Sequence, residues 1–122
     1  MAETRALLDA FGAAWTWIDE PKFKDSVRQP EVEPAAVAYL RLHGRNAREW
    51  WHHADRDARY RYLYSAEELE PIAQRLTRVA AGNHKAYAYL NNHPDARAVK
   101  NAKMLKALVG QETGTLPAAV EA

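Results

Sequence analysis

The chain has 122 residues, the size of a single domain, and its 48% hydrophobic and 27% charged residues are ordinary for a globular protein. Its net charge of +1 predicts no general attraction to nucleic acid or membranes, so an anion site must come from a local cluster of charges. The chain has no cysteine, which excludes disulfides and thiolate chemistry, and it shows neither a secretory signal nor a membrane-length apolar run, so a cytoplasmic location is expected.

The first half of the chain predicts one helix, two strands and a proline-rich connection between the strands. Three apolar residues at helical spacing, Leu7, Leu8 and Phe11, place the helix before Gly12. The strands combine aromatic and aliphatic residues, whereas the connection holds three prolines and many charges. These elements are expected at residues 3–11 (helix), 13–19 (strand), 20–34 (connection) and 37–44 (strand).

The second half predicts a helix, a strand and a final helix. Ser65 begins the first of these helices, because Glu68 completes a reciprocal capping arrangement with its hydroxyl. Pro94 fits the first turn of the final helix, where its missing N–H costs nothing. The elements are expected at residues 65–81 (helix), 85–92 (strand) and 94–109 (helix), after a polar, aromatic loop at residues 45–64.

The order of these elements predicts a parallel sheet. The second and third strands are separated by about forty residues that include a helix, and such a connection requires a parallel crossover. The link between the first two strands is long enough for the same geometry. The sequence therefore predicts an α/β fold with about three parallel strands and helices on one face.

Alternation along the strands divides their side chains between two faces. The face expected beneath the helices is small or aliphatic: Ala14, Thr16, Ile18, Ala38, Leu40, Leu42, Ala86, Ala88 and Leu90. The opposite face changes from aromatic to polar along each strand: Trp15, Trp17, Asp19, Tyr39, Arg41, His43, Tyr87, Tyr89, Asn91 and His93. Parallel α/β folds bind ligands at the carboxyl ends of their strands, so the polar residues predict a pocket there.

The chemistry of this pocket follows from its side chains. An arginine fork suits phosphate or carboxylate, so Arg41 and Arg45 are candidate ligand-binding residues, together with Asn91, His93, Tyr39 and Tyr89. The candidate catalytic residues are His43, as an acid or base, and Asp19.

Structural roles compete with these assignments. Arg41 is equally well explained as an ion pair with Asp19 on the neighbouring strand, and Arg45 as a solvated charge. Asn92 or His93 is expected to cap the final helix, because both precede Pro94.

A metal site is not predicted. Asp19, His43 and His93 have suitable donor atoms, but their spacing forms no compact ligand motif and no glutamate joins them on the polar face. No cofactor is assigned. The loop rings are expected to pack on the rim of the sheet, in preference to forming, with Arg59 and Arg61, a stacking surface for bases or sugars. These rings are Trp50, Trp51, Tyr60, Tyr62 and Tyr64.

Several segments resemble the YecE-like family, also called domain of unknown function 72. They are IDEPKF (18–23), YLRLHGRN (39–46), YLYSAEELEPIAQRL (62–76) and AYLNNHPDARAVKNAKMLKAL (88–108), within a resemblance that runs from about residue 5 to residue 110. The resemblance implies a TIM-type (β/α)8 barrel, distantly similar to those of the endonuclease IV and xylose isomerase type. The family's role is itself unassigned, so the resemblance implies a fold and a pocket but no reaction.

Only the C-terminal half of such a barrel is present, because a full barrel needs about 250 residues. Residues 1–110 are expected to form this partial barrel, and residues 111–122 a flexible tail. The chain is then a truncated gene product, half of a split protein or a self-assembling half-barrel. The first is favoured, because open strand edges and bare aromatic surfaces promote aggregation.

Two functions are compatible with this sequence. The leading one is a strand-end pocket for a phosphorylated, sugar-containing or nucleic-acid ligand, and whether the chain is an enzyme stays open. The alternative is a non-catalytic half-barrel that acts only by association, either with a complementary N-terminal half or in a homodimer.

Overall fold

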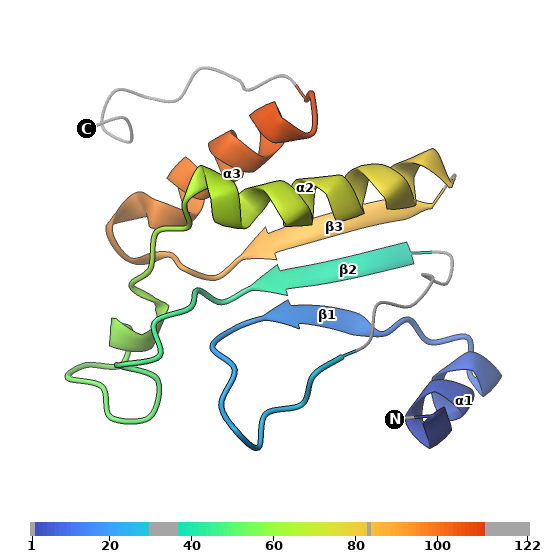
Figure 1. Cartoon of the computed structure of the whole chain (residues 1–122), viewed down its shortest axis with the longest axis horizontal. Helices are drawn as coiled ribbons and strands as arrows, with labels where there is room; N and C mark the ends of the chain where they lie inside the picture. The colour runs from blue at the N-terminus through green and yellow to red at the C-terminus, as the bar shows by residue number, and fades with distance from the viewer. Residues whose placement is uncertain (1, 30–36, 83, 112–122) are drawn as a thin grey trace.

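The computed structural model describes residues 2–29, 37–82 and 84–111. Most of the expected tail, and the end of the proline-rich connection, lie outside these residues. The elements, drawn in Figure 1, are α1 (Ala2–Ala10), β1 (Thr16–Asp19), β2 (Val37–Leu42), η1 (Ala58–Tyr60), α2 (Ala66–Ala81), β3 (Lys85–Leu90), η2 (Pro94–Ala96) and α3 (Arg97–Leu108), where η marks a short 3-10 turn.

The three strands form one parallel sheet in the order β1-β2-β3, as the sequence predicted. Tyr39 in the middle strand is level with Thr16 on one side and with Tyr87 on the other. Helices α2 and α3 lie along β2 and β3, whereas α1 lies apart, beyond the first strand (Figure 1). The predicted α/β class, strand direction and one-sided helix cover are therefore confirmed.

The core lies between the sheet and α2. Leu42 and Leu69 are completely buried, and together they join β2 to the first turns of α2. Burial of a leucine side chain contributes about 2 kcal/mol, so this contact is a large part of what fixes the helix on the sheet. The remaining buried members of this cluster are Trp17, Ala38, Leu40, Tyr64 and Val79.

The predicted faces of β1 are wrong. Trp17 is level with Leu40, is only 4% exposed, and its ring lies 3.2 Å from the guanidinium carbon of Arg75 on α2. Trp17 and Asp19 therefore belong to the helix-covered face, and Thr16 and Ile18 to the open face. The aromatic likeness of Trp17 to the tyrosines was misleading, because a wide indole ring is buried best where a helix covers the strand.

The start of α2 follows the predicted capping box. The Glu68 N–H donates to Ser65 Oγ at 3.2 Å, and the Ser65 N–H donates to Glu68 Oε2 at 2.9 Å.

The final helix is less regular than predicted. It opens with the turn η2, in which Asp95 and Ala96 both have a φ of 56°, and α3 follows at Arg97. Neither His93 nor Asn92 caps α3 in the described structure, so the capping expectation is wrong. Instead Asn92 is fully buried and donates to the Tyr62 carbonyl and to Asn101 Oδ1, which anchors the segment beneath the loop.

Within the described residues, no helix is both long and apolar enough to cross a membrane.

Candidate functional site

Arg41 extends from the open face of β2 and is held there by Asn91. Its Nε and Nη2 atoms donate to Asn91 Oδ1 at 3.1 and 2.9 Å. The two residues come from adjacent parallel strands, because the Asn91 N–H donates to the Leu42 carbonyl and so continues the pairing of β3 with β2. The sheet thus fixes the direction of the guanidinium while leaving its Nη1 atom without a partner among the described side chains.

His43 stands next along the same face. Its backbone N–H donates to the Asp19 carbonyl at 2.9 Å, which extends the pairing of β2 with β1 by one residue. Its half-buried ring lies 6.4 Å from the ring of Trp50 and 6.0 Å from that of Tyr60. No described side chain forms a hydrogen bond with the ring nitrogens, so the imidazole is available to a ligand.

The electrostatic surroundings keep His43 neutral. Burial lowers the pKa of its imidazole below the ordinary value of 6.5, and the charge of Arg41 lowers it further. The carboxylates of Glu20 and Asp19 act in the opposite direction but are outweighed. A neutral imidazole can accept a proton, which is what a general base near neutral pH requires.

This pKa gives a testable pH dependence. A lowered pKa in the folded state means that His43 stabilises the fold above pH 6.5, and that this contribution is lost as the pH falls through the folded-state pKa. We expect the free energy of unfolding of the wild type to decrease more steeply toward acid pH than that of His43→Gln. Urea unfolding of both proteins at several pH values checks this, and parallel pH profiles would contradict it.

Glu20 is the residue that the sequence reasoning missed. Among the described charges, its carboxylate has the largest influence on His43, and Lys22 Nζ lies 3.4 Å from its Oε1. Glu20 follows Asp19 directly and lies just past the last residue of β1. In the sequence, the adjacent acidic residues Asp19 and Glu20 were the signal that either carboxylate could act on His43.

Asp19 and Arg45 form a separate, structural cluster. Arg45 donates from Nε and Nη2 to the two carboxylate oxygens at 2.9 and 2.8 Å, and the Tyr64 hydroxyl donates to Oδ2 at 2.7 Å. The expected Arg41–Asp19 ion pair is therefore wrong, and Arg45 is not a solvated charge. Gly44 separates the two arginines, and Arg45 joins the helix-covered side.

This structural cluster continues into the cap of α2. Arg45 Nη1 lies 3.7 Å from Glu68 Oε1, and Tyr62 donates its hydroxyl to the same carboxylate. Burial and this hydrogen bond raise the pKa of Tyr62 to about 12, so its hydroxyl stays a donor. Asp19 at the end of β1 is thereby joined to the start of α2.

The remaining predicted residues lie at the edges of the site. The rings of Tyr39 and Tyr89 stack on the open face, with centroids 4.8 Å apart. His93 lies at the rim, where its ring is 5.8 Å from that of Tyr60 and its Nε2 is 3.5 Å from Asp57 Oδ1. Trp50, 9% exposed, packs on the strand ends as the sequence predicted, whereas Trp51 is 68% exposed and does not.

In the described part of the chain, no three His, Asp or Glu side chains gather as metal ligands would. The candidate site is the open-face cluster of Arg41, His43 and Asn91, beside the tyrosine pair, with the charge of Glu20 acting on His43.

The family model for DUF72, a protein of unknown function, matches residues 1–122. The chain belongs to the DUF72 family. This confirms the resemblance to YecE-like proteins. Among curated proteins, none matches this DUF72 chain.

Solved DUF72 structures share its fold. A DUF72 protein of Thermotoga maritima is 30% identical, with a TM-score of 0.81 over 89% of this chain and 41% of the other. A DUF72 protein of Enterococcus faecalis is 19% identical, with a TM-score of 0.77 over 95% of this chain and 44% of the other. The chain thus spans less than half the length of these relatives.

Proposed function

We propose that this DUF72 chain contributes one wall of a ligand pocket that binds a phosphate group carried by a sugar, whether in a small molecule or in nucleic acid. The observation that carries the proposal is the Arg41–Asn91 pair, directed along the open face beside an unbonded, neutral His43. An arginine whose direction is already fixed loses little entropy when it binds an anion, which favours recognition at this point.

The described contacts divide the work among three side chains. The free edge of the Arg41 guanidinium binds the anion, the Asn91 amide is placed to donate to a sugar oxygen, and His43 is placed to accept a proton from the ligand. The stacked rings of Tyr39 and Tyr89 offer an apolar surface for the sugar. Asp19 takes no part, because Arg45 and Tyr64 already occupy its carboxylate.

We further propose that residues 1–110 act as half of a TIM-type barrel in the cytoplasm, and that a complementary half completes the pocket. The chain spans 41% of its Thermotoga relative, and the open face leaves Tyr87 and Tyr89 45% and 46% exposed. Apolar side chains on and just after α1 are also exposed, since Leu7 is 60% and Phe11 80% exposed. Surfaces of this kind are normally buried by further structure.

Arg41→Lys tests the ligand proposal. The ammonium cannot reproduce the guanidinium fork, so we expect the affinity for inorganic phosphate and for a sugar phosphate to fall by roughly tenfold or more. Calorimetric titration measures this, and the affinity should also decrease as salt rises.

Arg45→Lys is the matched control. It should lower the melting temperature, because the paired hydrogen bonds to Asp19 are weakened, while phosphate affinity stays the same. Unchanged phosphate affinity in Arg41→Lys, with a lowered melting temperature, would make Arg41 structural and overturn the proposal.

A further inference from the structure

The outer edge of β3 is unpaired in the described sheet, and the structure identifies which of its backbone groups face outward. The Asn91 N–H points to β2, where it donates to the Leu42 carbonyl at 2.7 Å. Backbone groups alternate in direction along a strand, so the N–H and C=O groups of Tyr87 and Tyr89 also point to β2. Ala86, Ala88 and Leu90 therefore direct their N–H and C=O groups away from the sheet.

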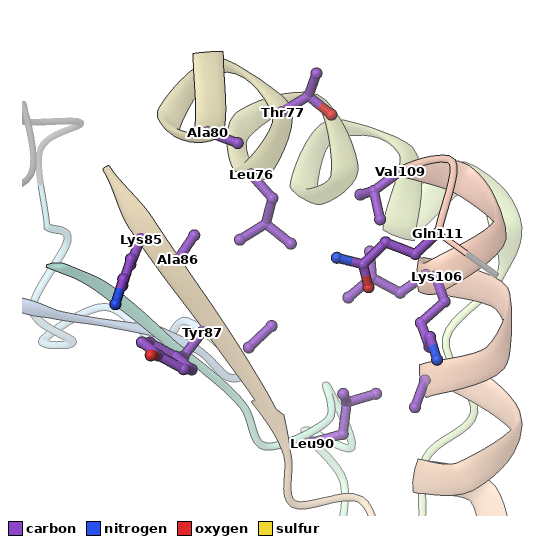
Figure 2. A pocket seen from close by; sticks show the side chains of 13 residues that line it. Leu76, Thr77, Ala80, Lys85, Ala86, Tyr87, Leu90, Lys106, Val109 and Gln111 are labelled. Atoms are coloured by element: carbon purple, nitrogen blue, oxygen red, sulfur yellow. The ribbon is translucent and has the colours of Figure 1, made fainter. Parts of the chain in front are cut away.

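An apolar groove runs beside this edge. A cavity of about 650 Å³ separates β3 from the C-terminal half of α2 and from α3, and Leu76 and Val109 point into it (Figure 2). Leu105 lines it from α3, and the small side chains of Ala86 and Ala88 leave the strand side of the groove open. The groove is half open to the outside, so a further segment of chain can enter it.

The position of the groove matches that of a missing strand. In a parallel α/β sheet, the helix after a strand crosses over to cover the next strand of the sheet. Helix α3 follows β3, and the groove lies where the helix-facing side chains of that next strand would pack.

Lys106 is the charged residue that lines the groove from α3, whereas Lys85 lies with Tyr87 on the other side of the strand (Figure 2). An occupant with a carboxylate near Lys106 is therefore favoured by charge.

We propose that the β3 edge and this groove bind a parallel β-strand from the part of a DUF72 barrel that this chain does not span. The occupant places apolar side chains in the groove on alternate residues, pairs its backbone with Ala86, Ala88 and Leu90, and carries an acidic residue facing Lys106. The inference rests on the half-barrel part of the proposed function and adds the surface, the strand direction and the register.

A second copy of this chain is a poorer occupant. Two copies would form a ring of six strands around two sets of open-face side chains. About eight strands are needed for an interior wide enough to be filled by side chains, so six strands would overpack the tyrosines.

Hydrogen exchange of individual amides tests the register. The chain is co-expressed and purified with the part of the Thermotoga protein that it does not cover, and its exchange is compared with that of the chain alone. We expect the Ala86, Ala88 and Leu90 amides to exchange much more slowly in the complex. The Tyr87 and Tyr89 amides should change little, because they already bond to β2. Protection at another surface, or none at these three amides, would overturn the inference.

Substitutions provide an independent measure. Ala88→Pro removes an outward N–H without removing a bond to β2, so we expect roughly tenfold weaker association. Lys106→Glu should weaken association by roughly two- to fivefold through charge, whereas Lys100→Glu, exposed on the same helix outside the groove, should have no effect. Equal association of Lys106→Glu and Lys100→Glu would contradict the charge assignment, even if Ala88→Pro does not fold.

The remaining outcomes distinguish failure of the half-barrel proposal from failure of the β3 edge as the binding surface. If the wild-type chain does not co-purify with the Thermotoga part, the half-barrel proposal itself fails. If the wild type and Ala88→Pro associate equally, association stands but the β3 edge is not its site. If the three amides become protected in the chain alone as its concentration rises, a second copy is the occupant and the inference is wrong.

Discussion

Gly44→Ala is expected to lower the free energy of unfolding by roughly 2–5 kcal/mol, from backbone strain together with steric overlap. Gly44 has a φ of +89°, which residues with a side chain rarely adopt. A Cβ atom at this position would lie 2.7 Å from Tyr62 Cβ, closer than real Cβ atoms approach other carbons. Because Tyr62 Cβ is bonded directly to the backbone, rotation of the Tyr62 side chain cannot move it away, and the overlap can only be relieved by moving the backbone.

The same glycine determines the arrangement of the site. It turns the chain between His43, on the open face, and Arg45, on the helix-covered side, and its N–H donates to the Tyr64 hydroxyl at 2.9 Å. Alanine should therefore also displace His43 and weaken phosphate binding. Urea unfolding and phosphate titration measure the two effects.

Gly12→Ala is the matched control for strain. Gly12 also has a positive φ, +63°, but no atom beyond its two neighbours in the chain lies within 4 Å of the position that a Cβ would occupy. We expect a loss of only about 1 kcal/mol there, with phosphate binding unchanged. Equal losses at the two glycines would show that overlap with Tyr62 contributes nothing.

Tyr64→Phe is expected to lower the free energy of unfolding by roughly 2–3 kcal/mol. Tyr64 is 1% exposed, and its hydroxyl both donates to Asp19 and accepts from the Gly44 N–H. Phenylalanine keeps the ring that packs in the core and against Arg45, so the variant isolates the hydroxyl. Loss of the hydroxyl leaves the buried Gly44 N–H without an acceptor, and this unsatisfied donor accounts for much of the decrease in the free energy of unfolding.

The exposed Tyr87 provides the comparison. Tyr87→Phe removes a hydroxyl that forms no hydrogen bond with the described residues, so stability should stay within about 0.5 kcal/mol of the wild type. Thermal or urea unfolding of the two variants distinguishes them. A Tyr64→Phe protein as stable as Tyr87→Phe would show that the Asp19 cluster does not hold the strand ends together.

Local chemistry made much of the fold predictable. The capping box at Ser65 determined the start of α2, because a hydroxyl and a carboxylate three residues apart satisfy each other's backbone N–H groups. The long helical connection between β2 and β3 required them to be parallel. Alternation along β2 correctly placed Arg41 on the open face and Leu40 and Leu42 in the core.

The site was harder to predict, because its contacts join distant parts of the chain. The sequence left Arg41 open between an anionic ligand and an ion pair with Asp19, whereas the register of β3 on β2 brings Asn91 to its guanidinium. Arg45 looked like a surface charge until Gly44 turned it toward Asp19.

The sequence by itself determined the class of fold and the strands that carry the candidate site, because these depend on periodicity, capping and spacing along the chain. Only the tertiary structure decided the faces of β1. One alternation of its four residues carries Trp17 and Asp19 and the other carries Thr16 and Ile18, so each has one large apolar side chain and either face can be buried. Helix α2 settled the choice by covering Trp17, which placed Asp19 on the same side, where it pairs with Arg45 and Tyr64.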